Sequence, residues 1–225
     1  MWQTSWGVSW RLIGAMIMTH GDDNGLVLPP KVAPIQVVII PIYYSDEDAQ
    51  KVLKKANEIS SSVSSNNIRV HVDDRDQLTP GYKFHDWELK GIPLRIEIGP
   101  KDIEKNKVVL VKRINKEKID VPIDDVAGKV NSILDDIQKQ MLISAKKILD
   151  ESTHNISSYE EFKSQIEKGG FLSTPWCGKQ ECEEKIKEET GADIRVIPFE
   201  SEDSTKKCVY CNEQSVSVPI FARGY

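Results

Sequence analysis

The sequence has no long apolar run, and it holds few of the residues that most often carry metal-based or nucleophilic chemistry. Its 225 residues include four cysteines, all in the last quarter, and four histidines that are scattered and form no ligand set. The apolar run at residues 12–18 is too short to span a bilayer, and polar residues follow it. We therefore expect a cytoplasmic protein with no signal peptide and no membrane contact.

The motifs of several enzyme classes are also missing from the sequence. The chain has neither a Walker loop for nucleotide phosphates nor a serine elbow with histidine and aspartate partners. The segment around His20 and Asp22 has the residue types of an acid–base pair, but a turn with a capping aspartate is the simpler interpretation. Spacing alone therefore predicts no catalytic site.

The charge balance excludes a protein that coats nucleic acid through a generally basic surface. The formal net charge is -5, yet the charges are unevenly distributed. Residues 67–118 carry 12 lysines and arginines against 9 acidic residues, a net of +3, so the remainder carries -8. Because the local field governs binding, a basic face in the middle of the chain remains compatible with these numbers.

Residues 1–30 are predicted to be the end of a larger domain. Three tryptophans fall within the first ten residues and need a partner surface to bury against. The mostly apolar stretch 10–18 fits either one buried strand or a short helix. Arg11 within this stretch favours a structural salt bridge, because a buried guanidinium needs an anionic partner. We interpret the chain as the tail portion of a longer protein.

Residues 34–140 have the pattern of an α/β domain. Runs of strand length alternate with segments whose apolar residues recur at helical spacing. Ser45, which precedes three acidic residues, is a candidate N-cap. This order predicts parallel strand pairs joined by crossover helices. The predicted strands are 35–42, 68–72, 92–98, 108–111 and 118–121, and the predicted helices are 45–63, 82–90 and 126–149.

The stretch at residues 79–100 is the one around which the other elements are organised. Pro80-Gly81 predicts a turn, a short charged helix follows it, and residues 92–98 alternate as a half-buried strand. Together they predict a surface suited to a polar partner; the alternative is an ordinary solvated helix and strand edge. The charged residues concerned are Lys83, His85, Glu88 and Lys90 on the helix, and Arg95 and Glu97 on the strand.

Residues 150–225 are predicted to form a separate small unit that holds all the cysteines. The pairs are Cys177-x4-Cys182 and Cys208-x2-Cys211, each in or beside a turn. Four thiolates in a tetrahedron make a closed structural zinc site, without an open position for catalysis. Two disulfides or free thiols are the alternatives, and disulfides are disfavoured in the cytosol. The predicted helices are 157–168 and 183–189, and the predicted strands are 194–199 and 215–221.

Three stretches resemble prolyl-tRNA synthetases of the archaeal and eukaryotic type. The third class II motif is matched by Thr4-Ser5-Trp6-Gly7, by Arg11 to Met18, by Thr19-His20-Gly21-Asp22-Asp23 and by Gly25-Leu26-Val27-Leu28-Pro29-Pro30. The anticodon-binding domain is matched by Pro80-Gly81-Tyr82-Lys83-Phe84, by Trp87-Glu88-Leu89-Lys90-Gly91 and by Gly99-Pro100. The paired cysteines and the terminal Tyr225 resemble the C-terminal zinc-binding domain of that family. The resemblance covers essentially the whole chain.

The resemblance implies an α/β fold in three parts. Residues 1–33 would be the end of the class II catalytic domain, and residues 34–140 an anticodon-binding domain with a mixed sheet and crossover helices. Residues 141–225 would be a small α/β zinc-binding domain. The full-length enzyme would join proline to tRNA(Pro) through a prolyl-adenylate, with ATP and Mg²⁺, as a homodimer.

The resemblance also assigns roles to individual residues. Arg11 would hold the ATP phosphates and adenine, as an always-charged planar donor suits. The residues lining the ATP and prolyl-adenylate pocket would be Gln3, Thr4, Ser9, Arg11 and His20. The residues facing the tRNA anticodon would be Lys83, Phe84, Glu88 and Arg95, where arginine suits guanine edges and phenylalanine suits stacking. The structural zinc would be held by Cys177, Cys182, Cys208 and Cys211.

Two departures from the family pattern bear on activity. The first two class II motifs do not occur in this sequence, and Trp10 stands where the family has a small threonine beside the motif arginine. We therefore predict that this chain does not charge tRNA by itself. Two rival hypotheses are a free-standing, non-catalytic RNA-binding or regulatory module, and a purely structural interaction piece that zinc staples together.

Overall fold

The computed structural model describes residues 3–200 and 205–224, so Trp2 and the terminal tyrosine lie outside the described residues. The chain divides into two compact units, Met1–Ala145 and Lys146–Tyr225, and the boundary between them falls within the residues of helix α5 (Val126–Glu151). The elements from the start of the chain through this helix are α1 (Arg11–His20), β1 (Val37–Pro41), α2 (Asp46–Ser64), β2 (Val70–Val72), α3 (Pro80–Leu89), β3 (Leu94–Ile98), α4 (Pro100–Glu104), β4 (Lys107–Lys112), β5 (Lys118–Pro122), the 3-10 helix η1 (Ile123–Asp125) and α5 (Val126–Glu151).

The first unit is built on a five-stranded mixed sheet in the order β2-β1-β3-β4-β5. Strand β1 pairs in parallel with both β2 and β3, and α2 and α3 are the crossover helices between them. Strands β4 and β5 add in antiparallel fashion on the other side of β3. The predicted strands, helices and parallel pairings of this region are therefore confirmed, as is Ser45, whose hydroxyl accepts a hydrogen bond from the Asp48 amide.

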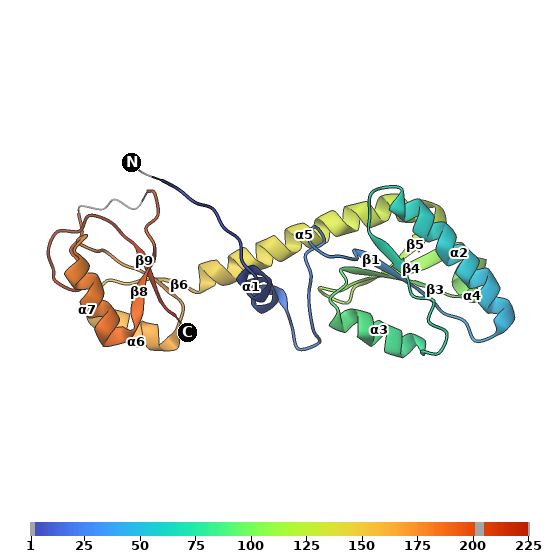
Figure 1. The fold of residues 1–225 in the computed structure, drawn as a ribbon, viewed down its shortest axis with the longest axis horizontal. Coiled ribbons are helices and arrows are strands. Elements are labelled where there is room, and N and C mark those ends of the chain that lie inside the picture. The colour runs from blue at the N-terminus through green and yellow to red at the C-terminus, as the bar shows by residue number, and fades with distance from the viewer. Residues whose placement is uncertain (1–2, 201–204, 225) are drawn as a thin grey trace. The chain divides into compact units, whose positions relative to one another are not determined.

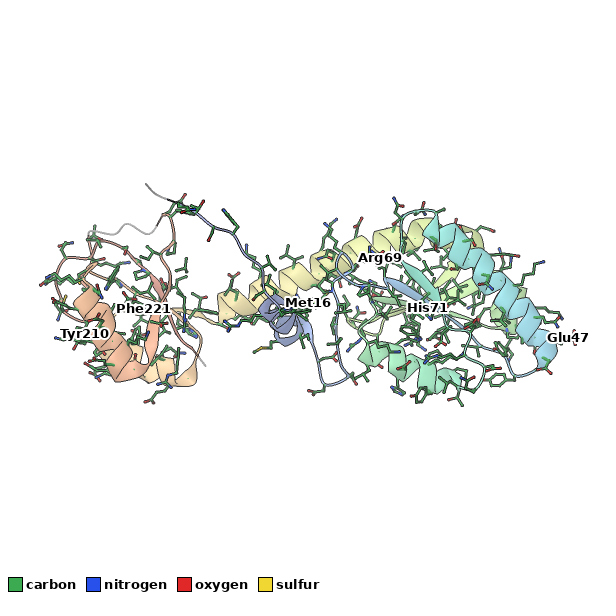
Figure 2. The ribbon with its side chains drawn as sticks, in the orientation of Figure 1. Met16, Glu47, Arg69, His71, Tyr210 and Phe221 are labelled. Carbon is green, nitrogen blue, oxygen red and sulfur yellow. The ribbon has the colours of Figure 1, made fainter. Side chains whose placement is uncertain are left out.

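Both faces of the sheet around β1 are covered, which explains why its sequence is apolar without alternation. Val37 and Ile39 belong to the main core, together with residues of α2 and α5. Val38 and Ile40 form a second cluster with Trp87 of α3 and its neighbours. Figure 1 accordingly shows α3 on the opposite side of the sheet from α2. Arg69, labelled in Figure 2, precedes β2 and donates hydrogen bonds to main-chain carbonyls at residues 30 and 33.

Two details of the organising stretch differ from the prediction. The expected turn at Pro80-Gly81 is the first turn of α3 instead. Proline suits the first helical position, because a backbone N–H at that position has no acceptor within the helix. The hydroxyl of Thr79 caps this helix by accepting from the Tyr82 amide. Strand β3 is not half-buried either: it is the central strand, and Glu97 is only 8% exposed. Its charged residues neutralise each other in an ion pair and can therefore be buried.

The segment before the sheet is a helix with an exposed surface, and none of the residues of α1 is buried. Of the two alternatives for the stretch 10–18, the short helix is confirmed and the buried strand is wrong. Arg11 is solvent-exposed, without the expected buried ion pair among the described residues. The predicted turn is present: the amides of Asp22 and Gly25 each donate to the other residue's carbonyl. A helix long and apolar enough to cross a bilayer is not found among the described residues.

The second unit has a four-stranded mixed sheet in the order β6-β7-β9-β8. Phe221 of β9, labelled in Figure 2, packs edge-to-face on Phe162 of α6 with ring centroids 5.4 Å apart. Residues 215–219 lie outside the strand that was expected there, because Trp176 exchanges main-chain hydrogen bonds with this segment beside the cysteines. The elements of this unit are β6 (Thr153–Asn155), α6 (Tyr159–Lys168), β7 (Phe171–Ser173), α7 (Gln180–Thr190), β8 (Ala192–Val196) and β9 (Ile220–Arg223).

Candidate nucleic-acid interface and metal centre

A pocket of about 150 Å³ opens on the α3 side of the first sheet, at the amino-terminal end of β3. We call it the α3 pocket. Five cationic side chains and one carboxylate contribute to its wall, and carboxylates next to the pocket pair with several of these cations. Apolar side chains of β1, β4 and α3 form its base. The lining residues are Val38, Trp87, Glu88, Ile92, Arg95, Val111, Lys112, Arg113, Lys116 and Lys118.

Among the described residues that line the α3 pocket, Glu88 supplies the only carboxylate. It lies near the end of α3, and its side chain is 14% exposed. The ammonium of Lys116 lies 2.8 Å from Glu88 Oε1 and, with a smaller opposing effect of burial, holds the pKa of Glu88 below its usual value. Since the Lys116 side chain is itself 60% exposed, a ligand with its own donors can take its place beside this carboxylate.

Arg95 reaches the same pocket from β3 and is held in a fixed orientation. Its Nε and Nη2 atoms donate to Glu97 Oε1 at 2.9 and 2.7 Å. Its guanidinium lies over the ring of Phe84, 4.3 Å from the centroid. Phe84 packs against the apolar cluster beneath α3, and its ring supports the Arg95 guanidinium at the wall of the pocket. A planar donor held in this way is suited to the edge of a planar acceptor.

The lysines of the pocket differ in exposure. Lys112 is paired with Glu117 at 2.9 Å and Asp136 at 3.1 Å, and it is largely buried. Lys116, in the turn between β4 and β5, and Lys118, the first residue of β5, are exposed. Exposed ammonium groups beside a pocket attract phosphate without fixing its position.

A buried aspartate fixes α3 against the sheet. Asp73 follows β2, is fully buried, and accepts from Trp87 Nε1 at 2.7 Å. Arg75 donates to both of its oxygens at 2.8 and 2.7 Å and also binds Asp86 of α3. These bonds outweigh the opposing effect of burial and lower the pKa of Asp73 to about 2. Helix α3, which carries Glu88, is therefore held by a charged network as well as by packing.

Lys83 has a different position from the one expected. Only 3% of its side chain is exposed, and its ammonium donates to the main-chain carbonyl of Asp73 at 3.0 Å. Lys83 therefore lies in the network beneath α3 and does not line the α3 pocket. Sequence reasoning in turn missed Arg113 and Lys116, although the net charge of +3 over residues 67–118 already indicated a basic face in this region.

The residues expected at a nucleotide site are exposed or only half-buried in the part of the chain that the structure describes. Gln3, Thr4 and Ser9 lie on an exposed segment without helix or strand, and Arg11 is the exposed first residue of α1. His20 ends that helix, and burial lowers its pKa. The hollow beside the end of α1 is lined by other residues, namely Ile17, Met18, Gly21, Asp22, Asp23, Gly25, Leu26 and Leu89.

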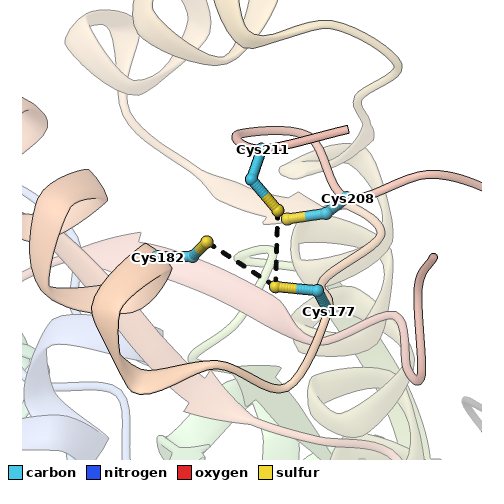
Figure 3. A group of neighbouring side chains, drawn as sticks. All are labelled: Cys177, Cys182, Cys208 and Cys211. Atoms are coloured by element: carbon cyan, nitrogen blue, oxygen red, sulfur yellow. Dashed lines mark hydrogen bonds between the residues drawn. The ribbon is translucent and has the colours of Figure 1, made fainter. Parts of the chain in front are cut away.

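The four cysteines converge in the second unit, as Figure 3 shows. All four sulfur atoms lie within 4.8 Å of one another. The sulfur of Cys177 lies 3.6 Å from those of Cys182 and Cys211, far beyond a disulfide bond, and all four thiols are free. A tetrahedral zinc ion with ~2.3 Å bonds separates its sulfurs by ~3.8 Å. The spacing therefore fits such an ion.

A helix end and a tight turn hold the cysteines of this cluster in place. Cys182 lies in the first turn of α7, while Cys208 and Cys211 lie in a tight turn closed by the amide of Asn212 on the Cys208 carbonyl. Burial raises the pKa of Cys177 and that of Cys182, so a bound cation is needed to stabilise four thiolates. For Cys208, backbone amides around the sulfur outweigh burial and lower its pKa. The donor set and its surroundings both fit a structural metal ion.

Two known protein families match different parts of the chain. Residues 36–133 match a family described as an anticodon-binding domain. Residues 159–225 match the C-terminal domain of prolyl-tRNA synthetase. These two ranges contain, respectively, the α3 pocket and the cysteine cluster.

Curated relatives and solved structures agree with these matches. A proline–tRNA ligase of Cenarchaeum symbiosum is 53% identical over 224 residues, covering 100% of this chain and 47% of the relative. One of Natranaerobius thermophilus is 49% identical over 228 residues, with 100% and 47% coverage. The prolyl-tRNA synthetase of Cryptosporidium parvum, solved with L-proline and AMP, superposes with a TM-score of 0.91 at 39% identity, covering 96% of this chain and 46% of that one. The chain thus spans about half the length of its relatives, and it belongs to the prolyl-tRNA synthetase family, whose anticodon-binding and C-terminal domains it contains.

Proposed function

We propose that the α3 pocket binds the anticodon of tRNA(Pro). The observation that carries this proposal is that Glu88 and Arg95, from a helix and a strand, line one pocket. Proline codons begin with two cytosines, so the anticodon carries two guanines. A guanine offers N–H donors to a carboxylate on one edge and acceptors to a guanidinium on another, which is the chemistry of this pair. Phosphates beside the base would meet Lys116 and Lys118.

We further propose that the chain serves a proline–tRNA ligase that uses ATP and Mg²⁺ to form prolyl-adenylate in the cytoplasm, as a homodimer. The division into residues 1–33, 34–140 and 141–225 belongs to this proposal. Gln3, Thr4, Ser9, Arg11 and His20 would contribute to the nucleotide site once further catalytic segments surround them. Their exposure supports the expectation that the isolated chain does not charge tRNA. Proline-dependent pyrophosphate exchange by this chain alone would contradict that expectation.

We propose zinc as the metal of the cysteine cluster. Four cysteine sulfurs are a donor set that zinc prefers, and a closed site of this kind has no open position for a substrate. The ion would supply folding energy to the second unit, and it would take no part in the ligase reaction.

Glu88→Gln tests the anticodon proposal. Glutamine keeps the size of the side chain but loses the charge that accepts from guanine, so the preference for the native anticodon should fall about ten-fold. The measurement compares affinities for tRNA(Pro) and for the same tRNA with both guanines replaced by adenine. Glu58→Gln, on the opposite side of the sheet in α2, is the matched control and should keep the preference. An unchanged preference in Glu88→Gln would contradict the proposed role.

A free-standing RNA-binding module remains the rival function. It predicts the same anticodon binding, but no ligase partner or parent enzyme. Similarity that extends over 100% of the chain, including residues 1–33, supports the ligase instead.

A further inference from the structure

One guanidinium connects the α3 pocket to the turn that follows α1. Arg113 donates from Nη1 and Nη2 to the two carboxylate oxygens of Asp22, at 2.8 and 2.6 Å. Its Nε donates to the main-chain carbonyl of Glu88 at 3.1 Å. Only 4% of the Arg113 side chain is exposed, whereas 42% of the Asp22 side chain is, so the buried guanidinium is held by a carboxylate at the surface. The same residue therefore lines the pocket, holds the end of α3 and holds the turn.

Main-chain contacts attach the same turn to the same end of α3. The amide of Leu26 donates to the Leu89 carbonyl at 3.0 Å, and that of Leu28 donates to the Gly91 carbonyl at 3.2 Å. A side chain at Gly25 or Gly91 would come within 2.6 Å of the opposing backbone, and both glycines have positive φ. The two segments are thus in direct contact, and their backbones are too close for an added side chain at either glycine. These contacts give a shift of the α3 end a direct path to residues 22–28.

We propose that Asp22 and Arg113 form a clamp that couples occupancy of the α3 pocket to the turn at residues 20–28. This inference rests on the proposed function, because it takes RNA as the occupant of the pocket. A base bound at Glu88 fixes the end of α3, and the clamp passes this restraint to the turn that carries His20 at its start. Asp22 does not line the pocket, so it acts as a positioning residue. Arg113 is the side chain through which it acts.

The coupling has a reciprocal consequence. If bound RNA restrains the turn, loosening the turn must weaken RNA binding by the same factor. A purely structural role for Asp22 would lower stability without changing the ratio of affinities for native and altered anticodons. The affinity ratio therefore separates a positioning role from a structural one.

The test uses this chain and two RNA stem-loops, one with the proline anticodon and one with both guanines replaced by adenine. Amide hydrogen exchange is measured at residues 20–28 with and without each RNA. The proline stem-loop should slow exchange there about five-fold in the wild type, and the altered one should not. In Asp22→Asn this protection should disappear, and the affinity ratio between the stem-loops should fall about five-fold.

Two further variants sharpen the result. Asp23→Asn removes a charge at the neighbouring exposed position and should behave as the wild type. Asp22→Glu keeps the charge and should restore part of the protection. Anticodon-selective binding with the same protection and affinity ratio in Asp22→Asn as in the wild type would overturn the clamp while leaving the proposed function intact. Failure of the wild type to bind either RNA would remove the proposed function and the clamp with it.

Discussion

Cys208→Ser is expected to unfold the second unit while the first unit stays folded. Cys208 is fully buried, and its sulfur belongs to the four-cysteine cluster. The second unit, Lys146–Tyr225, is small, and structural zinc sites contribute on the order of 10 kcal/mol to folding. The first unit has its own apolar core, built from its own sheet and helices, and does not depend on the cysteines.

The experiment measures bound zinc by elemental analysis and amide exchange in each unit. Zinc should be lost from Cys208→Ser, and exchange should become fast in α6, α7 and their strands but remain slow in β1 and β3. Adding a chelator to the wild type should have the same effect, and zinc should reverse it. Ser164→Ala, at an exposed site of α6, is the control and should keep both zinc and protection. A protected second unit without bound metal would refute the structural zinc proposal.

Asp73→Ala is expected to destabilise the first unit by about 3–5 kcal/mol. The substitution leaves the Trp87 indole N–H without its acceptor and removes the anion that Arg75 and buried Lys83 face. Losing one partner of a buried charged network leaves the others uncompensated, which costs more than the pair itself contributes. Chemical denaturation gives the difference in unfolding free energy. Asp74→Ala, at the exposed neighbouring position, should change it by less than about 0.5 kcal/mol.

The same aspartate predicts a dependence of stability on pH. Its pKa of about 2 in the folded protein lies below the ordinary aspartate value of ~3.9. The charged form therefore stabilises the fold above pH ~4, and this contribution, about 2–3 kcal/mol, is lost as pH falls toward 2. Between these two pH values the stability of Asp73→Ala should fall less steeply than that of the wild type. Parallel curves for the two proteins would contradict the charged state assigned to Asp73.

The order of strands and helices could be predicted because each element has a local signal. Apolar residues in β1 and helical spacing in α2 report burial directly, and Ser45 marks a helix start through its own side chain. For β3 the alternation of apolar and polar residues predicted a half-buried strand, which is wrong. Arg95 and Glu97 are charged, but their ion pair allows them to be buried. In α1 the apolar pattern predicted burial, but pattern alone does not specify a covering surface.

The candidate sites were predictable in part for similar reasons. Two close pairs of cysteines predicted a metal site by their spacing, and the structure brings all four together. The resemblance identified Glu88 and Arg95, which line one pocket. The contact of Asp22 with Arg113 joins residues 91 positions apart, and no local pattern encodes such a pair. Burial of Lys83 likewise depends on Asp73, which lies on a different element.

The affinity of the wild-type chain for tRNA(Pro) tests the assignment of the α3 pocket. It is compared with the affinity for the same tRNA after both anticodon guanines are replaced by adenine, at a fixed ionic strength of about 0.15 M. The account predicts at least ten-fold tighter binding of the native anticodon, because Glu88 and Arg95 read guanine edges. Equal affinities, or no binding of either tRNA, would contradict the assignment of the α3 pocket as an anticodon site.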